Sequence, residues 1–531
     1  MINPGTKFEL ADLVSDEMPF TTLIGRYGAA NAPNDTQLSA HIYRLAKDAE
    51  DKQGKHDQDE LYLVLEGERE IEIHLPNGQD PIHKSLKPLD LVYVPKHHAH
   101  SFLGSDRFVT LVIFTPEFTG PTITTESAIH TRDDLIEALR LACRLEHGLM
   151  VQYLFASFSL ASEPDGLDPE TWEAVRVIRE QILKVAREEM AHLGTVANLM
   201  IAIGATPDFS LPPFPQKNIG EWFPFPFCLE RIGNESMERF LRFEQPEEDD
   251  SDGEIDHIGE LYRSIYSGFL NVAGTTETLF DGDFFDQDSN DWGAGLEIFS
   301  VRSTDDVESA IRFIIEEGEG SSIQPDLSDL KLPPHEFFNG RRSHYERFLY
   351  IQQLVARLET EKVPWRKNVL NNPAAKEDPA RHGDVTLIES ENAVRAAELF
   401  NDFYVSLLLM LMAFYDHAQE TDEERALLRR LMKGTMSGII RPLAEIITDL
   451  PAFDKGDVRA APTFEIGAYV SVAPKSPARW KRLFERVSSS LEKCRKLQSD
   501  GVHGRFEFVL RNIEIIHEEI DQVRPGGSRN A

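Results

Sequence analysis

The chain has 531 residues, with 55 Lys and Arg against 90 Asp and Glu, so its formal net charge is −35. This acidity argues against nucleic acid or an anionic membrane as a partner. The three cysteines, Cys143, Cys228 and Cys494, are far apart, which excludes a disulfide framework and a thiolate zinc site. The start of the chain lacks the pattern of a signal peptide, and the longest apolar run, Phe403–Tyr415, is too short to span a bilayer. We therefore expect a cytoplasmic protein in which that run is a buried helix.

Short β-rich runs alternate with turn-prone stretches in the first 120 residues. They lie at Ala40–Leu45, Leu61–Leu65, Arg69–Leu75, Leu89–Val94 and Phe108–Phe114. Several short strands at this spacing predict a small all-β sandwich or barrel. His56 and Glu60 are four residues apart, so on one strand they point to the same side. A further histidine, His100, follows about forty residues later.

This region resembles the cupin superfamily. Glu60 is followed by Gly67 at the interval of the first cupin motif, and VPKHHAHSF places His100 at the expected offset of the second. The resemblance implies a metal site with His56, Glu60 and His100 as ligands, a set that suits iron, manganese or zinc. Gly54 stands where the first motif has another histidine. The alternative is a cupin without a metal, used for packing or dimerisation.

Two helices with acidic residues on their apolar faces are predicted after a Thr-rich joint at residues 120–127. In Arg176–Ile203 one apolar stripe runs at helical spacing, and Glu189 and His192 occupy consecutive places on it. The preceding helix places Glu146 on its apolar stripe in the same way. Burying a lone carboxylate costs several kcal/mol or shifts its pKa, and a metal ion held between helices removes that cost. The two stripes together favour a metal site over a structural salt bridge.

The stretch EEMAHL, preceded on the first helix by RLEHGLMVQYL, resembles the ferritin-like family of iminophenylpyruvate dimer synthases, found in pigment and indolocarbazole biosynthesis. The likeness continues through LMIAIGATPDF, IIEEGEG and SHYERF and covers about residues 130–450. It implies a metal site in the bundle with the ligands Glu146, Glu189, His192, Glu319 and His344. Glu316, one turn from Glu319, is a further candidate. Arg341 stands where a symmetrical di-iron site has a carboxylate, so the site is expected to hold either one ion or two.

A long insert, rich in Pro, Phe, Asp and Gly, interrupts the bundle at about 206–303. Its acidic run is interpreted as a solvated loop, and its aromatic, proline-rich part is expected to pack over one end of the bundle and wall a substrate pocket. No catalytic acid or base is predicted from it. Beyond a polar connection, the apolar helix at 392–415 and the amphipathic helices at 480–498 and 502–523 are expected to cover the bundle or form a dimer face.

We therefore predict an α+β multidomain protein. A cupin-like β-sandwich over 1–125 is followed by a ferritin-like four-helix bundle over 126–360 and extra C-terminal helices over 361–531. The implied function is a non-haem metal enzyme, with up to two irons in the bundle, that uses dioxygen to oxidise a small aromatic or amino-acid-derived metabolite in secondary metabolism. A second metal in the cupin and a homodimer are compatible with this prediction. Two alternatives stay open: a non-catalytic metal-binding or scaffold protein, and a cupin-centred mononuclear metal enzyme with a structural bundle.

Overall fold

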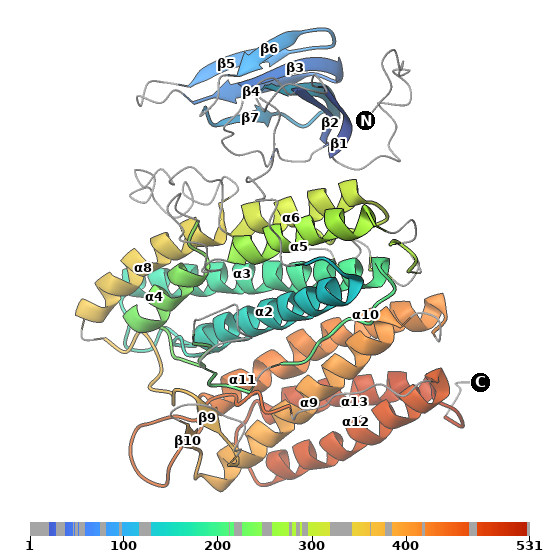
Figure 1. Cartoon of the computed structure of the whole chain (residues 1–531). Helices are drawn as coiled ribbons and strands as arrows, with labels where there is room; N and C mark the ends of the chain where they lie inside the picture. The colour runs from blue at the N-terminus through green and yellow to red at the C-terminus, as the bar shows by residue number, and fades with distance from the viewer. Residues whose placement is uncertain are drawn as a thin grey trace. The chain divides into compact units, whose positions relative to one another are not determined.

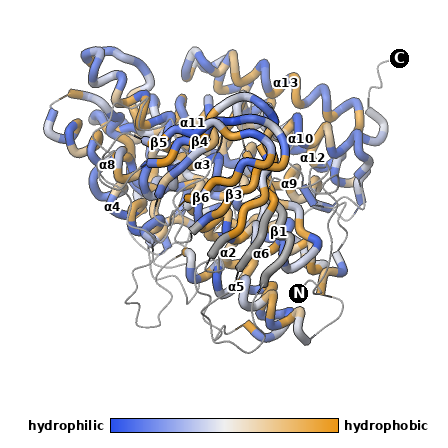
Figure 2. The backbone as a smooth tube through the Cα atoms, turned by 90° about the horizontal axis from the view of Figure 1, so that it is seen from above, coloured by the Kyte–Doolittle hydropathy of each residue, from blue (hydrophilic) through white to orange (hydrophobic). Residues whose placement is uncertain are grey.

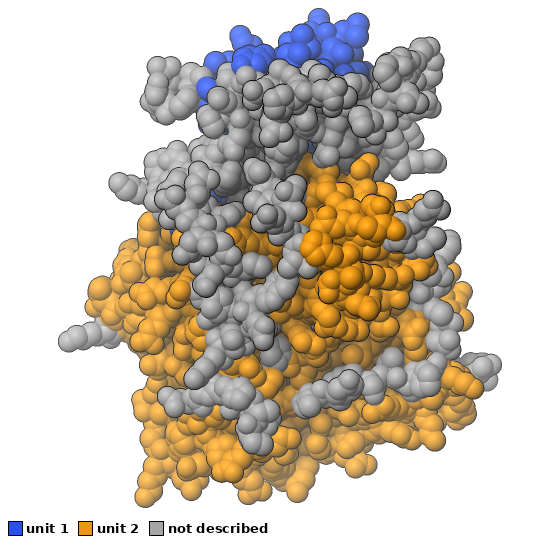
Figure 3. Space-filling model, in the orientation of Figure 1, with its two compact units in different colours: residues 1–124, 316–346 blue, residues 125–315, 347–531 orange. Residues whose placement is uncertain are grey.

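The computed structural model describes two compact units. The described residues are 21–27, 38–45, 47, 51, 59–74, 81–94, 98–115, 129–211, 213–216, 226–246, 258–275, 279–282, 287–288, 292, 296–318, 342–361, 363–377, 385–416, 420–466 and 475–527. One unit comprises residues 1–124 and 316–346, and the other comprises 125–315 and 347–531 (Figure 3). The division cuts two continuous helices, α6 (Thr304–Gly318) and α8 (His344–Thr360), whose larger parts lie in the second unit. We call the two the β unit and the helical unit and count both helices with the helical unit.

The β unit is a sandwich of two antiparallel sheets (Figure 1). Its described strands are β1 (Thr21–Tyr27), β2 (Leu38–Leu45), β3 (Asp59–Glu66), β4 (Arg69–Ile73), β5 (Ile82–Leu86), β6 (Leu91–Val94), β7 (His100–Leu103) and β8 (Phe108–Thr115). The larger sheet has the order β1-β2-β8-β3-β6, and the smaller has the order β5-β4-β7. On β4, buried and half-buried residues alternate, which is the pattern of a strand with one face on a core. The prediction of an N-terminal β-sandwich is confirmed.

Apolar side chains from both sheets form the core of the sandwich. They are Tyr43, Leu45, Tyr62, Val64, Ile71, Ile73, Leu86, Val94, Phe102, Phe108 and Val112. Figure 2 shows hydrophobic positions along β3 and β6. Strands β1, β5 and β7 are not among those that the sequence pattern indicated. On β5 all residues but the last are exposed, so its sequence, IHKSL, carries no alternating apolar signal.

In the helical unit, α2 (Arg132–Phe158) and α3 (Pro169–Ala202) pack along each other (Figure 1). A capping box starts α2: the Asp134 N–H donates to the Thr131 hydroxyl, and the Thr131 N–H donates to the Asp134 carboxylate. At the start of α3, the Asp168 carboxylate accepts hydrogen bonds from backbone N–H groups of the first turn. Both helices thus begin at residues whose side chains satisfy the free N–H groups of a helix start.

The insert contributes two helices to this unit, α4 (Asn234–Phe243) and α5 (Ile258–Ala273), which the sequence analysis did not predict. The backbone of α5 comes close to the residues just before α2, since a Cβ placed on Gly268 would lie 2.5 Å from Ile129 Cγ2. Most of the acidic run, interpreted as a solvated loop, lies outside the described residues. The insert is therefore part of the helical packing around α2.

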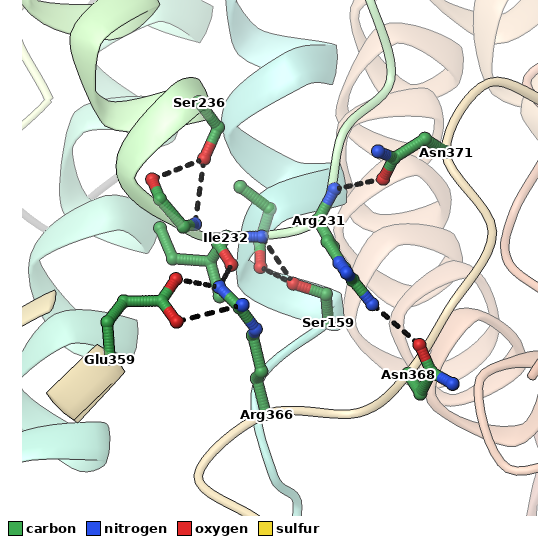
Figure 4. Close-up of polar contacts among 10 residues, drawn as sticks. Ser159, Arg231, Ile232, Ser236, Glu359, Arg366, Asn368 and Asn371 are labelled. Carbon is green, nitrogen blue, oxygen red and sulfur yellow. Dashed lines mark hydrogen bonds and ion pairs between the residues drawn. The ribbon is translucent and has the colours of Figure 1, made fainter. Parts of the chain in front are cut away.

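Polar contacts fix the start of α4 against the ends of α2 and α8 (Figure 4). The Ile232 N–H donates to the Ser159 hydroxyl over 2.9 Å, just beyond the end of α2. Arg366 donates to the Ile232 carbonyl and forms an ion pair with Glu359 of α8 at 2.6 Å. These contacts join three segments that are distant in the sequence.

A second group of helices completes the unit. It consists of α9 (Glu391–Tyr415), α10 (Asp422–Thr435), a π-helical turn (Met436–Ile440), α11 (Arg441–Ile447), α12 (Ser476–Ser499) and α13 (Phe506–Val523), with a short parallel pair, β9 (Pro373–Ala374) and β10 (Thr386–Leu387). By length and composition, α9 is the one described helix that could cross a membrane, but 67% of its most apolar window is buried inside the protein. It packs against α10, α11 and α12 (Figure 1). The structure confirms the predicted buried helix at Phe403–Tyr415.

Candidate metal centre

Glu146 of α2 meets Glu189 and His192 of α3 in the interior of the helical unit. One ligand atom from each residue lies within 4.8 Å of the others. His192 Nδ1 is 3.3 Å from Glu189 Oε2 and 3.6 Å from Glu146 Oε2. No more than 2% of any of the three residues is exposed. The structure thus brings together, from two helices, three residues that the sequence singled out.

The surroundings of Glu146 make its ionised form costly when no cation is bound. Burial and the neighbouring Glu189 carboxylate raise the pKa of Glu146 to about 8, while His192 acts in the opposite direction. Tyr262 of α5 donates a hydrogen bond to Glu146 Oε1. Among the described residues, none donates a hydrogen bond to the buried Oε2. A divalent cation between the two carboxylates would favour the ionised form of both.

Glu189 also belongs to a second buried group, in which its ligand atom and those of Glu244 and His344 lie within 4.8 Å of one another. Glu244 directly follows α4, and His344 is the first residue of α8. One turn further along α8, Phe348 packs on Tyr153 of α2 with a ring-centroid distance of 5.0 Å. This packing holds the first turn of α8 beside α2. Glu189 is therefore shared by two adjacent groups, each completed by one glutamate and one histidine.

Other predicted residues of the bundle are placed differently. Glu319 and Arg341 lie outside the described residues. Glu316 is exposed on α6 and belongs to neither group. Its position separates it from the two buried sets of ligand atoms.

Glu244 and Tyr262 are the residues of this centre that the sequence analysis missed. Both come from the insert, which was interpreted from its Pro, Asp and Gly content. A signal for Glu244 was present, because it follows Met237 and Phe240 at helical spacing on the buried face of α4. The same holds for Tyr262, which lies one turn from Ile258 and Tyr266 on the buried face of α5. The two helices have 10 and 16 residues, and an apolar stripe of that length is enough to predict a helix.

The β unit holds a smaller polar set between its two sheets. Glu60 lies on β3 and His100 on β7, and His100 Nε2 is 3.2 Å from Glu60 Oε2. The Tyr62 hydroxyl donates to Glu60 Oε2 and is 2.9 Å from His100 Nε2. Burial opposes protonation of His100, but the hydrogen bond and charge of Glu60 outweigh it and raise the pKa of the imidazole. His56, the third predicted ligand, lies outside the described residues. Two predicted ligands are thus brought together, with a phenol hydroxyl bonded to both.

The helices and the buried carboxylate–imidazole groups define the class of protein. Residues 139–353 match the Ferritin-like family, so this part of the chain is a ferritin-like domain, as predicted. It follows the N-terminal β-sandwich in the chain.

Two curated enzymes are similar to this chain. Dichlorochromopyrrolate synthase of Lentzea aerocolonigenes is 26% identical over 72% of the chain and 41% of its own length. The 2-imino-3-(indol-3-yl)propanoate dimerase of Chromobacterium violaceum is 24% identical over 63% of the chain and 34% of its own length. The chain therefore spans less than half the length of either relative. Both names are those of enzymes, and the second names an indole-bearing substrate.

Two solved structures resemble parts of the chain. A ferritin-like protein from Caulobacter vibrioides is 17% identical, with a TM-score of 0.38, over 58% of this chain and 94% of its own. A cupin superfamily protein from Desulfitobacterium hafniense is 23% identical, with a TM-score of 0.16, over 21% of this chain and 93% of its own.

Proposed function

We propose that the helical unit holds one or two metal ions, most simply iron, and uses dioxygen to oxidise a small aromatic or amino-acid-derived metabolite. The observation that carries this proposal is the pair of buried groups that share Glu189. Three carboxylates and two imidazoles suit iron or manganese in several oxidation states. The number of ions and their identity belong to the proposal, as do dioxygen, a homodimer and a cytoplasmic location.

The donor set fits such a cation. Glu146 Oε2 is buried, accepts no hydrogen bond from the described residues and faces His192 Nδ1 at 3.6 Å. A cation is the partner that satisfies a buried carboxylate oxygen beside a second carboxylate. Glu146, Glu189 and His192 would hold one ion, and Glu189, Glu244 and His344 would hold the other.

The chain's own residues have separate roles in this centre. Tyr262 orients Glu146 by donating to Oε1, and so leaves Oε2 as the oxygen that faces His192. Aromatic rings pack beside the ligands, which are themselves buried: the ring centroids of Phe313 and His192 are 6.5 Å apart, and those of Phe348 and Tyr153 are 5.0 Å apart. A bound redox-active metal supplies electron transfer and dioxygen binding, which these side chains do not provide.

The substrate class in this proposal rests on the similarity to the two enzymes. The name of one relative, 2-imino-3-(indol-3-yl)propanoate dimerase, describes the dimerisation of an imino acid that bears an indole. We propose an imino acid derived from an aromatic amino acid as the substrate. The chain can be tested with an aromatic 2-oxo acid and ammonium, which supply the imine, by following dioxygen uptake and the mass of a coupled product.

Metal analysis is the experiment that tests the site. The full chain is produced in iron-supplemented medium as the parent and as Glu189→Ala, His56→Ala and Glu420→Gln. We expect Glu189→Ala to lose the metal of the helical unit, because Glu189 belongs to both groups. Glu420→Gln is the matched control, since Glu420 is a buried glutamate bonded to Arg479 outside the centre. If Glu189→Ala keeps the full metal content of the parent, the proposed site is wrong.

The two alternatives predict other results. A metal enzyme centred on the cupin predicts that His56→Ala loses metal and that Glu189→Ala does not. The hydrogen bonds of Tyr62 to both Glu60 and His100 count against this alternative, because a cation there would have to displace that hydroxyl or bind it. A non-catalytic scaffold predicts that Glu189→Ala loses metal while dioxygen uptake is absent in the parent with every aromatic imine tested.

A further inference from the structure

Each of the two groups has one glutamate that the other group lacks. A buried tyrosine donates a hydrogen bond to each of these two glutamates. Tyr262 of α5 donates to Glu146 Oε1, and Tyr153 of α2 donates to Glu244 Oε1. Both tyrosines are fully buried. The shared carboxylate, Glu189, joins the groups, and each outer carboxylate has its own phenol. The arrangement is thus one tyrosine for each group of ligand atoms.

In each of these hydrogen bonds the phenol hydroxyl is the donor and a carboxylate oxygen is the acceptor. A phenol that donates to one oxygen of a carboxylate leaves the other oxygen as the better ligand for a cation. For Glu146 that other oxygen is Oε2, the one on the side of His192.

The packing around Tyr153 leaves it little freedom. Its ring contacts Phe240 of α4 at 4.8 Å and Phe348 of α8 at 5.0 Å, and these two rings are 5.4 Å apart. Phe240 lies one turn before Glu244, and Phe348 lies one turn after His344. Tyr153 therefore connects α4 and α8, which together with Glu189 of α3 supply the second group. Tyr262 is held by α5, whose backbone packs closely at Gly268 against Ile129.

We propose that Tyr262 and Tyr153 are positioning residues, each dedicated to one cation position: Tyr262 to that of Glu146 and His192, and Tyr153 to that of Glu244 and His344. Each fixes its glutamate as a ligand through a single oxygen. This inference rests on the proposed metal site. A merely structural hydrogen bond would contribute to the stability of the fold, but its loss would not weaken one cation position and spare the other.

Cobalt(II) titration of the metal-free full chain, followed by visible absorption, tests the assignment. The His344→Ala variant keeps only the first cation position, that of Glu146 and His192. The His192→Ala variant keeps only the second, that of Glu244 and His344. In the His344→Ala background we expect Tyr262→Phe to weaken cobalt binding about 10- to 100-fold and Tyr153→Phe to leave it unchanged. In the His192→Ala background the two tyrosine variants should exchange their effects. A fall in the absorptivity of bound cobalt would indicate a higher coordination number, as expected if the freed carboxylate binds through both oxygens.

Tyr404→Phe is the matched control, because Tyr404 is a buried tyrosine of the same unit that bonds to His147 at 2.8 Å. It should bind cobalt as the parent does. The inference is overturned if the tyrosine variants bind like the parent, or if each weakens both positions equally. If the parent binds no cobalt, the proposed metal site itself fails, and this inference fails with it. The two tyrosines are tested separately, so a variant that does not fold leaves the other as the test.

Discussion

Buried carboxylates of the helical unit have two kinds of partner. Glu420 and Asp288 pair with guanidinium groups, at 2.7 Å from Arg479 and 3.1 Å from Arg429. Glu146 instead faces a second carboxylate, an imidazole and a phenol. Ion pairs of the first kind satisfy a buried charge within the protein, whereas the second kind leaves an excess of negative charge. This difference separates structural acids from candidate metal ligands at the scale of single residues.

The pairing of Glu420 leads to a prediction about pH. Burial raises the pKa of Glu420 to about 7, and the Arg479 charge offsets only part of that rise. Between pH 4.5 and 7 the folded state then binds more protons than the unfolded state, so the free energy of unfolding falls as the pH rises. In the Glu420→Gln variant, we expect this decrease in the free energy of unfolding to be smaller by on the order of 2 kcal/mol. Urea unfolding at pH 5 and pH 7, for parent and variant, measures it; equal pH dependence in both would contradict the assignment.

In the β unit, Tyr62 is the hydrogen-bond partner of two buried polar side chains. Its hydroxyl bonds to Glu60 and His100, so Tyr62→Phe leaves two buried polar groups with one partner fewer. We expect a loss of about 1–3 kcal/mol in the stability of the β unit. The exposed Tyr93 is the control, and Tyr93→Phe should change stability by less than about 0.5 kcal/mol. Thermal unfolding of the full chain measures both, and similar effects of the two variants would refute the proposed role of Tyr62.

Among the secondary-structure elements, α2 and α3 can be predicted from the sequence because the apolar stripe on each helix spans several turns. A stripe of that length fixes which residues face inward, so the sequence alone identifies Glu146, Glu189 and His192 as buried. Tyr262 and Glu244 are missed because their helices lie in a stretch rich in Pro, Asp and Gly, and this composition masks the helical spacing. Strand β5 was missed for a different reason, since its exposed residues have no apolar alternation. The cap of α2 at Thr131, by contrast, is a local signal, because Thr131 and Asp134 are only three residues apart.

The close approach of α5 predicts a difference between two glycines. A Cβ on Gly268 would lie 2.5 Å from Ile129 Cγ2, whereas among the described residues the nearest neighbour of a Cβ on Gly434 of α10 would be Ile516 Cδ1 at 3.8 Å. We expect Gly268→Ala to destabilise the helical unit by about 1–3 kcal/mol through overpacking. Gly434→Ala should stabilise it by about 0.5–1 kcal/mol, because alanine loses less backbone entropy in a helix. Chemical denaturation measures both, and a destabilising Gly434→Ala would mean that helix propensity does not decide the outcome there.

At the scale of the whole molecule, the chain combines a β-sandwich with a ferritin-like domain and further helices, and each unit has its own buried polar set. The similarity to the two curated enzymes extends over 72% and 63% of the chain, well beyond the 139–353 segment that matches the family. The C-terminal helices are expected to cover the bundle or form a dimer face; among them, α9 packs against α10, α11 and α12. The two polar sets lie in different units. A measurement that follows hydrogen exchange in individual peptides can therefore assign metal binding to one of them.

Metal binding should stabilise the helical unit selectively. A ligand that binds only the folded state adds about 2.7 kcal/mol at a concentration of 100 times its Kd. If the centre is formed by Glu146, Glu189, His192, Glu244 and His344, manganese(II) or cobalt(II) should slow hydrogen exchange in peptides of α2, α3 and the first turns of α8. Peptides of β3 and β8 should exchange at unchanged rates. The double variant His192→Ala/His344→Ala should lose the protection, and excess chelator should reverse it in the parent. Protection confined to β3 and β7 would instead assign the cation to Glu60 and His100 in the β unit.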